Sequence, residues 1–215
     1  MLKLLVLFSF LIALGLGIAT VFGWQAAKYA WSSHVPFTPT TPTFQLVPPA
    51  HSLTAQLTTL TGEPLKEPRD TTDKLPVTLN ETLLEGETLF TDATSSATVH
   101  FPQFATIALD ANSQIVLSDA QPEHFLITHR DGLIKYQAHH PSQTLSIRAS
   151  SVLIALTSGE AALAIDHTRR TVTLQLLTGT AKLAIIGADN QTRTWNINAG
   201  QTAVVNTATT QVTLN

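Results

Sequence analysis

The sequence has no cysteine and little charge, and each shortage narrows the class of protein. Without cysteine the chain has no disulfide, no thiolate nucleophile, no cysteine-based zinc site and no lipid-modified N-terminal cysteine. Charged residues make up 13% of the chain, about half the usual share of soluble proteins, so Thr, Ser, Asn and Gln must cover much of the surface. The net charge of -3 comes without a basic cluster, which argues against a nucleic-acid partner, because phosphate binding needs many Lys and Arg.

A long hydrophobic run opens the chain. No charged residue lies between Lys3 and Lys28, and two side chains within Leu4–Trp24 are polar. As a helix these 21 residues would rise about 31 Å, which matches a bilayer core of about 30 Å, whereas a cleaved signal peptide has an apolar region of about 7 to 15 residues. We therefore predict a transmembrane signal anchor over residues 1–27, with the C-terminal part outside the cytoplasm. The alternative is a long signal peptide that is cleaved.

Residues 28–52 form a tether rich in proline and threonine. Five of the eleven prolines lie between positions 35 and 50, where they fix φ and remove backbone donors. This excludes a helix or a central strand and favours extended polyproline II, at about 3.1 Å per residue. Residues 35–50 would then hold the next domain up to about 50 Å from the membrane. The alternative is a proline-rich ligand for a partner's groove.

Residues 53–215 carry the pattern of an all-β domain. Apolar and polar side chains alternate in short runs, such as Ala97–Phe101, and turn residues separate the runs about every 8 to 12 positions. Such a strand buries one face and exposes the other to water. We expect about a dozen strands in a two-sheet β-sandwich or a short β-solenoid. Glycine pairs predict several of the turns between strands: Asp131-Gly132, Ser158-Gly159 and Thr178-Gly179.

Four histidines lie close together in the sequence: His124, His129, His139 and His140. Imidazole binds zinc or copper at neutral pH, so the group is a candidate metal site. His124 and His129 are an odd number of positions apart, however, and would face opposite sides of one strand. We therefore predict solvated histidines and no metal site.

Carboxylates suited to acid-base catalysis are also few. Glu85 and Glu87 flank a glycine, but a catalytic pair needs a pocket that the sequence does not indicate. Asp131 precedes Gly132, a pair that predicts a hairpin turn rather than a catalytic group. Both positions are interpreted as turn residues.

Two further motifs have a structural interpretation. Ser158-Gly159 lacks the strand, nucleophile and helix of a hydrolase elbow. Asn80 and Asn190 fit the glycosylation acceptor pattern and are interpreted as turn residues. We therefore expect no enzyme, with no catalytic residue, no cofactor and no metal.

Strands and glycine turns follow one another in seven segments: Leu57–Gly62, Leu83–Thr91, Ser95–Phe101, Ile107–Leu117, Asp131–Ile134, Leu177–Ala181 and Asn198–Val204. Their order resembles the FecR domain, named after the ferric citrate regulator. Domains of that family open with a short strand and a glycine, continue with a Gly-Glu phrase, and then alternate small residues, strands and glycine turns. The resemblance covers roughly Thr54 to Val205.

The resemblance implies an extracytoplasmic β-domain of a bacterial envelope protein. The sequence departs from the family at Pro102–Ala105, where an Asp-Gly-Ser turn is usual. It also shows no counterpart of the family's cytoplasmic anti-sigma segment. We expect a membrane-anchored module that binds an envelope protein or acts as a scaffold. The alternatives are a regulatory component of envelope signal transduction and a module that binds cell-wall glycan.

Overall fold

The computed structural model describes residues 52–140, 142–187 and 190–215. The predicted anchor at residues 1–27 lies outside these ranges, as does the predicted tether except for Ser52. Within the described ranges, no helix is long and apolar enough to cross a membrane.

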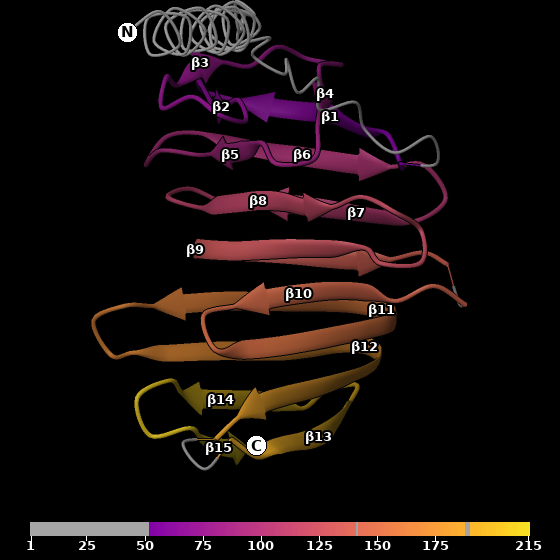
Figure 1. Cartoon of the computed structure of the whole chain (residues 1–215), viewed down its shortest axis with the longest axis vertical. Coiled ribbons are helices and arrows are strands. Elements are labelled where there is room, and N and C mark those ends of the chain that lie inside the picture. Colours follow the sequence, from indigo (N-terminus) through magenta and orange to yellow (C-terminus); the bar gives the residue numbers. More distant parts are fainter. Residues whose placement is uncertain (1–51, 141, 188–189) are drawn as a thin grey trace, which may run out of the picture. The chain divides into compact units, whose positions relative to one another are not determined.

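The described part of the chain consists of strands, which confirms the predicted all-β class. In the described ranges, fifteen strands belong to one open sheet (Figure 1). Their bounds are β1 Ala55–Thr61, β2 Leu65–Glu67, β3 Leu75–Pro76, β4 Thr82–Leu83, β5 Thr88–Phe90, β6 Ser96–Phe101, β7 Ala105–Leu109, β8 Gln114–Asp119, β9 Leu126–Ala138, β10 Leu145–Ala149, β11 Val152–Asp166, β12 Thr171–Ile186, β13 Thr192–Asn198, β14 Thr202–Asn206 and β15 Gln211–Leu214.

The sheet has two rows of strands that share three long members. The first row runs β4-β1-β6-β7-β9-β11-β12-β14-β15. The second row runs β3-β2-β5-β8-β9-β10-β11-β12-β13 and faces the viewer in Figure 1. We expected a two-sheet β-sandwich or a short β-solenoid. Because β9, β11 and β12 pair in both rows, the strands instead form a single sheet that folds over itself.

Glycines allow the long strands to pass from one row to the other. Gly159 of β11 pairs with Gly179 of β12, and their φ angles are +98° and +84°, which side chains rarely adopt. A Cβ on Gly159 would clash with the carbonyl of Thr178, and one on Gly179 with the carbonyl of Ser158. The two backbones can approach this closely only because neither residue has a side chain. These glycine pairs therefore bend strands, whereas the sequence predicted turns between strands.

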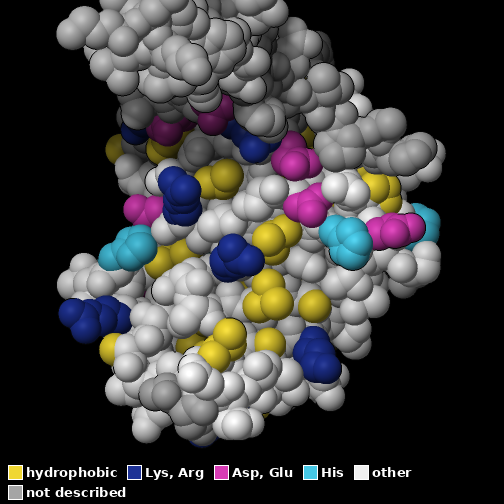
Figure 2. Space-filling view, in the orientation of Figure 1, with side chains coloured by type: hydrophobic (Ala, Val, Ile, Leu, Met, Phe, Trp, Pro, Cys, Tyr) yellow, Lys and Arg dark blue, Asp and Glu magenta, His cyan; other side chains and the backbone are white. Residues whose placement is uncertain are grey.

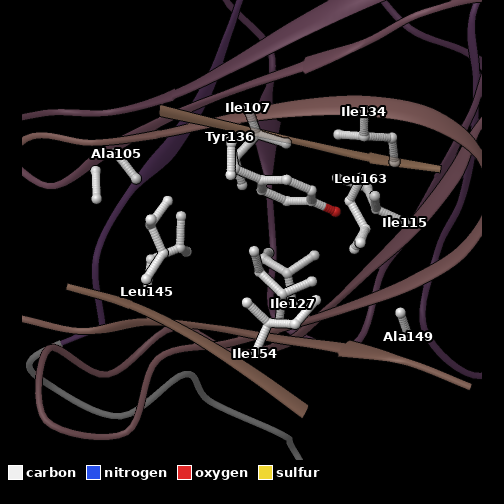
Figure 3. Close-up of a cluster of buried hydrophobic side chains, with 14 of the residues drawn as sticks. Ala105, Ile107, Ile115, Ile127, Ile134, Tyr136, Leu145, Ala149, Ile154 and Leu163 are labelled. Atoms are coloured by element: carbon white, nitrogen blue, oxygen red, sulfur yellow. The ribbon is translucent and has the colours of Figure 1, made fainter. Parts of the chain in front are cut away.

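The hydrophobic core lies between the two rows, because alternate residues of each strand face inward. Figure 3 shows Ile107, Tyr136 and Leu163 of the first row pointing toward Ile127 and Ile154 of the second, and all five side chains are fully buried. Fully burying one aliphatic side chain stabilises the fold by about 1.5 to 3 kcal/mol. The alternation seen in the sequence thus supplies one continuous core.

Candidate functional site

Glu85 and Glu87, the two glutamates of the predicted turn, do not form an acid-base pair. Glu87 is 5% exposed; its Oε1 lies 3.2 Å from Lys66 Nζ, and its Oε2 accepts a hydrogen bond from the backbone N–H of Leu84 at 2.7 Å. The Glu85 carboxylate instead accepts from the backbone N–H of Ala120 at 3.4 Å. Each carboxylate fixes a separate stretch of backbone.

Lys66 of β2 links Glu87 to a second carboxylate. Its Nζ lies 2.8 Å from Glu81 Oε1, and the side chains of Lys66 and Glu81 are 12% and 29% exposed. Burial by itself lowers the pKa of Lys66, but the hydrogen bonds and charges of the two glutamates outweigh it and raise this pKa above its ordinary value. Burial by itself raises the pKa of Glu81, but hydrogen bonds from Lys66 and Thr78 lower it overall. The network joins β2 to the segments before β4 and β5.

The four clustered histidines are not brought together as ligands. His124 is exposed, and His140 Nδ1 pairs with the Ser142 hydroxyl at 3.1 Å. His139 Nε2 lies 2.9 Å from Thr106 Oγ1. In the ranges that the structure covers, no group of three or more His, Asp or Glu side chains could hold a metal ion. His100 lies outside the predicted group, but its Nδ1 lies 3.2 Å from the same Thr106 hydroxyl.

His129 is buried, contrary to the predicted solvated histidine. Its Nε2 lies 3.0 Å from the carbonyl oxygen of Asp131 and 3.2 Å from that of Gly132. Carbonyl oxygens only accept hydrogen bonds, so Nε2 carries the proton of the neutral ring. Among the described residues, Nδ1 of this buried ring has no hydrogen-bond partner. The same holds for the hydroxyl of Tyr136, whose ring centroid is 6.0 Å from that of His129. Burial lowers the pKa of His129 to about 4 and raises that of Tyr136.

The remaining predicted motifs have backbone roles. Asp131 and Gly132 lie inside β9, where the Asp131 carboxylate accepts from the Gly132 N–H at 2.8 Å, so the predicted hairpin turn is wrong. Ser158 lies inside β11 beside the bend. Asn80 and Asn190 have φ angles of 64° and 57°, a left-handed conformation that asparagine tolerates in turns. This agrees with their interpretation as turn residues.

A candidate partner-binding site lies at the end of the second row. Strand β13 pairs with β12 along one edge, and no other described strand pairs with its second edge. Its seven residues make it longer than the other terminal strands of the sheet, since β3 and β4 have two residues each and β15 has four. An unpaired edge presents N–H and C=O groups to which an extended peptide can add as a further strand.

A shallow depression beside this edge is largely apolar. This apolar hollow of about 440 Å³ is lined by Leu153, Ala184 and Ile186, with Thr192 of β13 and Arg148 at its margins. Leu153 and Ile186 are 44% and 62% exposed. Figure 2 looks onto the same side of the molecule and shows hydrophobic side chains between separated cationic ones. Exposed apolar surface next to a free strand edge suits an extended polypeptide with apolar side chains.

Solved structures share the fold. Two crystal structures, at 2.50 Å and 1.65 Å resolution, are each described as a “putative anti-sigma factor” from Parabacteroides distasonis ATCC 8503. Their TM-scores are 0.52 and 0.51, at 9% and 8% sequence identity. Each match covers 60% of this chain and 58% of the other, so it spans less than two thirds of those proteins. No protein-family model and no curated protein matches the chain.

Proposed function

We propose that the β-domain is a FecR-like protein-binding module of the bacterial cell envelope, anchored by residues 1–27 and held outside the cytoplasm. The observation that carries this proposal is the edge of β13 with which no described strand pairs, close to the apolar hollow. Backbone hydrogen bonds along such an edge supply affinity, and side-chain pockets next to it supply specificity. The fold shared with structures described as anti-sigma factors supports a place in envelope signalling.

In this proposal the domain binds and does not catalyse. The carboxylates of Glu85 and Glu87 accept backbone hydrogen bonds, and Glu87 also balances the charge of Lys66. The ring of His129 is held by two carbonyl oxygens away from solvent. Groups engaged in this way support the backbone, whereas an acid, base or nucleophile must reach a substrate.

A regulatory component of envelope signal transduction is the second candidate. The likeness to candidate anti-sigma factors favours it. In that role the bound partner would be a membrane protein that passes the signal onward. Recovery of a sigma-type or anti-sigma-type protein with the chain would support this role over that of a scaffold.

The test is an affinity pull-down of the full-length chain from crosslinked native membranes. The Thr194→Lys variant places a charge on β13, where Thr194 is exposed. The control is Gln175→Lys, an equally exposed position on β12 that is flanked by β11 and β14. We expect the wild type and the control to recover one stoichiometric envelope protein and Thr194→Lys to lose it.

Two results contradict the proposal. If Thr194→Lys recovers the same partner as the wild type, the free edge is not the binding site. If the chain recovers no protein but sediments with purified cell wall, the module binds glycan.

A further inference from the structure

The second row of the sheet has an outer hollow lined by two arginines, Arg130 and Arg148. This arginine hollow measures about 240 Å³ and is lined by Arg130, Arg148, Ser150 and His167, among others. No hydrogen bond or ion pair engages the guanidinium group of Arg130 or Arg148 in the described part of the chain. A guanidinium group offers five donors, so the lining has unused capacity to bind an anion.

The strand register explains why the two arginines lie together. Strands β9 and β10 run parallel, with Arg148 opposite Thr128. Arg130 follows Thr128 by two positions in β9, so both arginines project from the same outer face. Ser150 follows the last residue of β10, with φ 53°, and completes the margin. The two arginines thus lie on neighbouring strands of one surface, offset by two residues along the strands.

The carboxylates near the arginine hollow are already engaged. Asp131 accepts the Gly132 N–H and lies 3.5 Å from His167 Nε2. Asp166 accepts the backbone N–H of Arg169 at 2.9 Å and lies 3.7 Å from the side chain of the same residue. Neither carboxylate neutralises Arg130 or Arg148. An external anion between these two guanidinium groups would remove their mutual repulsion.

The arginine hollow continues into the apolar hollow. The two share Arg148 and Ser150 in their linings, and the apolar surface of Leu153 and Ile186 begins on the far side of Arg148. A ligand bound to the arginines therefore has apolar surface within reach of the rest of its body. Inorganic phosphate would leave that surface uncovered.

We propose that the joined hollows bind a small amphiphilic carboxylate. Its carboxylate accepts hydrogen bonds from Arg130 and Arg148, whose planar forks match carboxylate geometry. Its apolar body lies over Leu153 and Ile186. This site goes beyond the proposed partner binding, because a small molecule would occupy the surface next to the β13 edge.

The test measures binding of hexanoate, acetate and inorganic phosphate to the full-length chain by isothermal titration calorimetry. We expect hexanoate to bind most tightly, and Arg148→Gln and Arg130→Gln each to weaken it about tenfold, since a charge-assisted hydrogen bond is lost. The matched control is Lys182→Gln, which removes an exposed cation that lines neither hollow. Ile186→Asn should weaken hexanoate and leave acetate unchanged.

Several results would overturn the proposal: no binding of hexanoate, acetate that binds as tightly as hexanoate, phosphate that binds more tightly than both, or equal losses in Lys182→Gln and Arg148→Gln. The exposed position of Arg148 keeps its variant foldable, and thermal unfolding verifies this. Failure here with continued recovery of an envelope protein would leave the proposed function standing. If the chain binds hexanoate but recovers no envelope protein, the carboxylate site stands and the proposed function fails.

Discussion

Two regions of the sheet differ in whether their cationic side chains are paired with carboxylates. At the N-terminal end, Lys66 is largely buried and lies within 3.2 Å of both Glu81 and Glu87. In the arginine hollow, Arg130 and Arg148 share one outer face, and their guanidinium groups have no hydrogen bond or ion pair in the part of the chain that the structure covers. The first region satisfies its charges internally, and the second leaves them available.

The difference separates charges that serve the fold from charges that suit a ligand. A largely buried lysine without its carboxylates would cost several kcal/mol of desolvation, so we expect the network around Lys66 to stabilise the fold. Exposed arginines are hydrated and need no partner, so Arg130 and Arg148 are not required by the fold. Substitutions should therefore affect stability in the first region and binding in the second.

The largest effect is expected from Lys66→Met. It leaves the nearly buried carboxylate of Glu87 without its cation, which should lower the free energy of unfolding by about 4 kcal/mol. Urea denaturation followed by far-UV circular dichroism measures the change. Adding Glu87→Met should restore part of the loss, because the unpaired charge is removed. A loss below about 1 kcal/mol in Lys66→Met would mean that the network is a surface ion pair.

His129, which also lines the arginine hollow, and Glu81 of the Lys66 network should respond to acid in different pH ranges. The pKa of His129 in the folded protein is about 4, below its ordinary value of 6.5, so the unfolded chain binds the extra proton between these values. Stability should then fall as the pH drops from 6.5 to about 4, by about 3 kcal/mol in total. The pKa of Glu81 is lowered from 4.5, so its contribution is present above pH 4.5 and is lost as the pH falls through the lowered value.

Urea denaturation at a series of pH values tests this separation. In His129→Gln the loss between pH 6.5 and 4 should disappear, while the loss at lower pH remains. His124→Gln, at an exposed histidine, should keep the wild-type profile. An unchanged profile in His129→Gln would show that another group causes the loss of stability above pH 4.

Sequence alternation predicted the strands and the buried face, because each depends on neighbours two positions apart. Ala97, Val99 and Phe101 are buried as expected. The glycine pairs were located correctly but misinterpreted: Gly159 and Gly179 have the positive φ typical of turn glycines, yet they bend paired strands. A turn between strands and a bend within paired strands both need a glycine with positive φ. The local sequence therefore does not distinguish them, because it does not show which strand lies opposite.

The arginine hollow could not be predicted from the sequence. Arg130 and Arg148 are brought together by the parallel pairing of β9 with β10, and this register depends on how the whole sheet folds over itself. The burial of His129 was missed for a similar reason. His129 follows Ile127 by two positions, so both side chains lie on one face of β9, but the sequence does not show which residues cover that face. The network of Lys66 with Glu81 and Glu87 was not predicted either, because these residues are far apart in the sequence.

The smallest effect on stability is expected from Arg130→Gln and Arg148→Gln. Both side chains are exposed and have no hydrogen bond or ion pair to another described residue, so each change should alter the free energy of unfolding by less than about 0.5 kcal/mol. The double variant should be no less stable than the wild type, because two neighbouring like charges are removed. Urea denaturation in low salt gives the most sensitive comparison, since salt screens exposed charges. A loss above about 2 kcal/mol in either single variant would place that arginine with Lys66 as part of the fold and remove the contrast between the two regions.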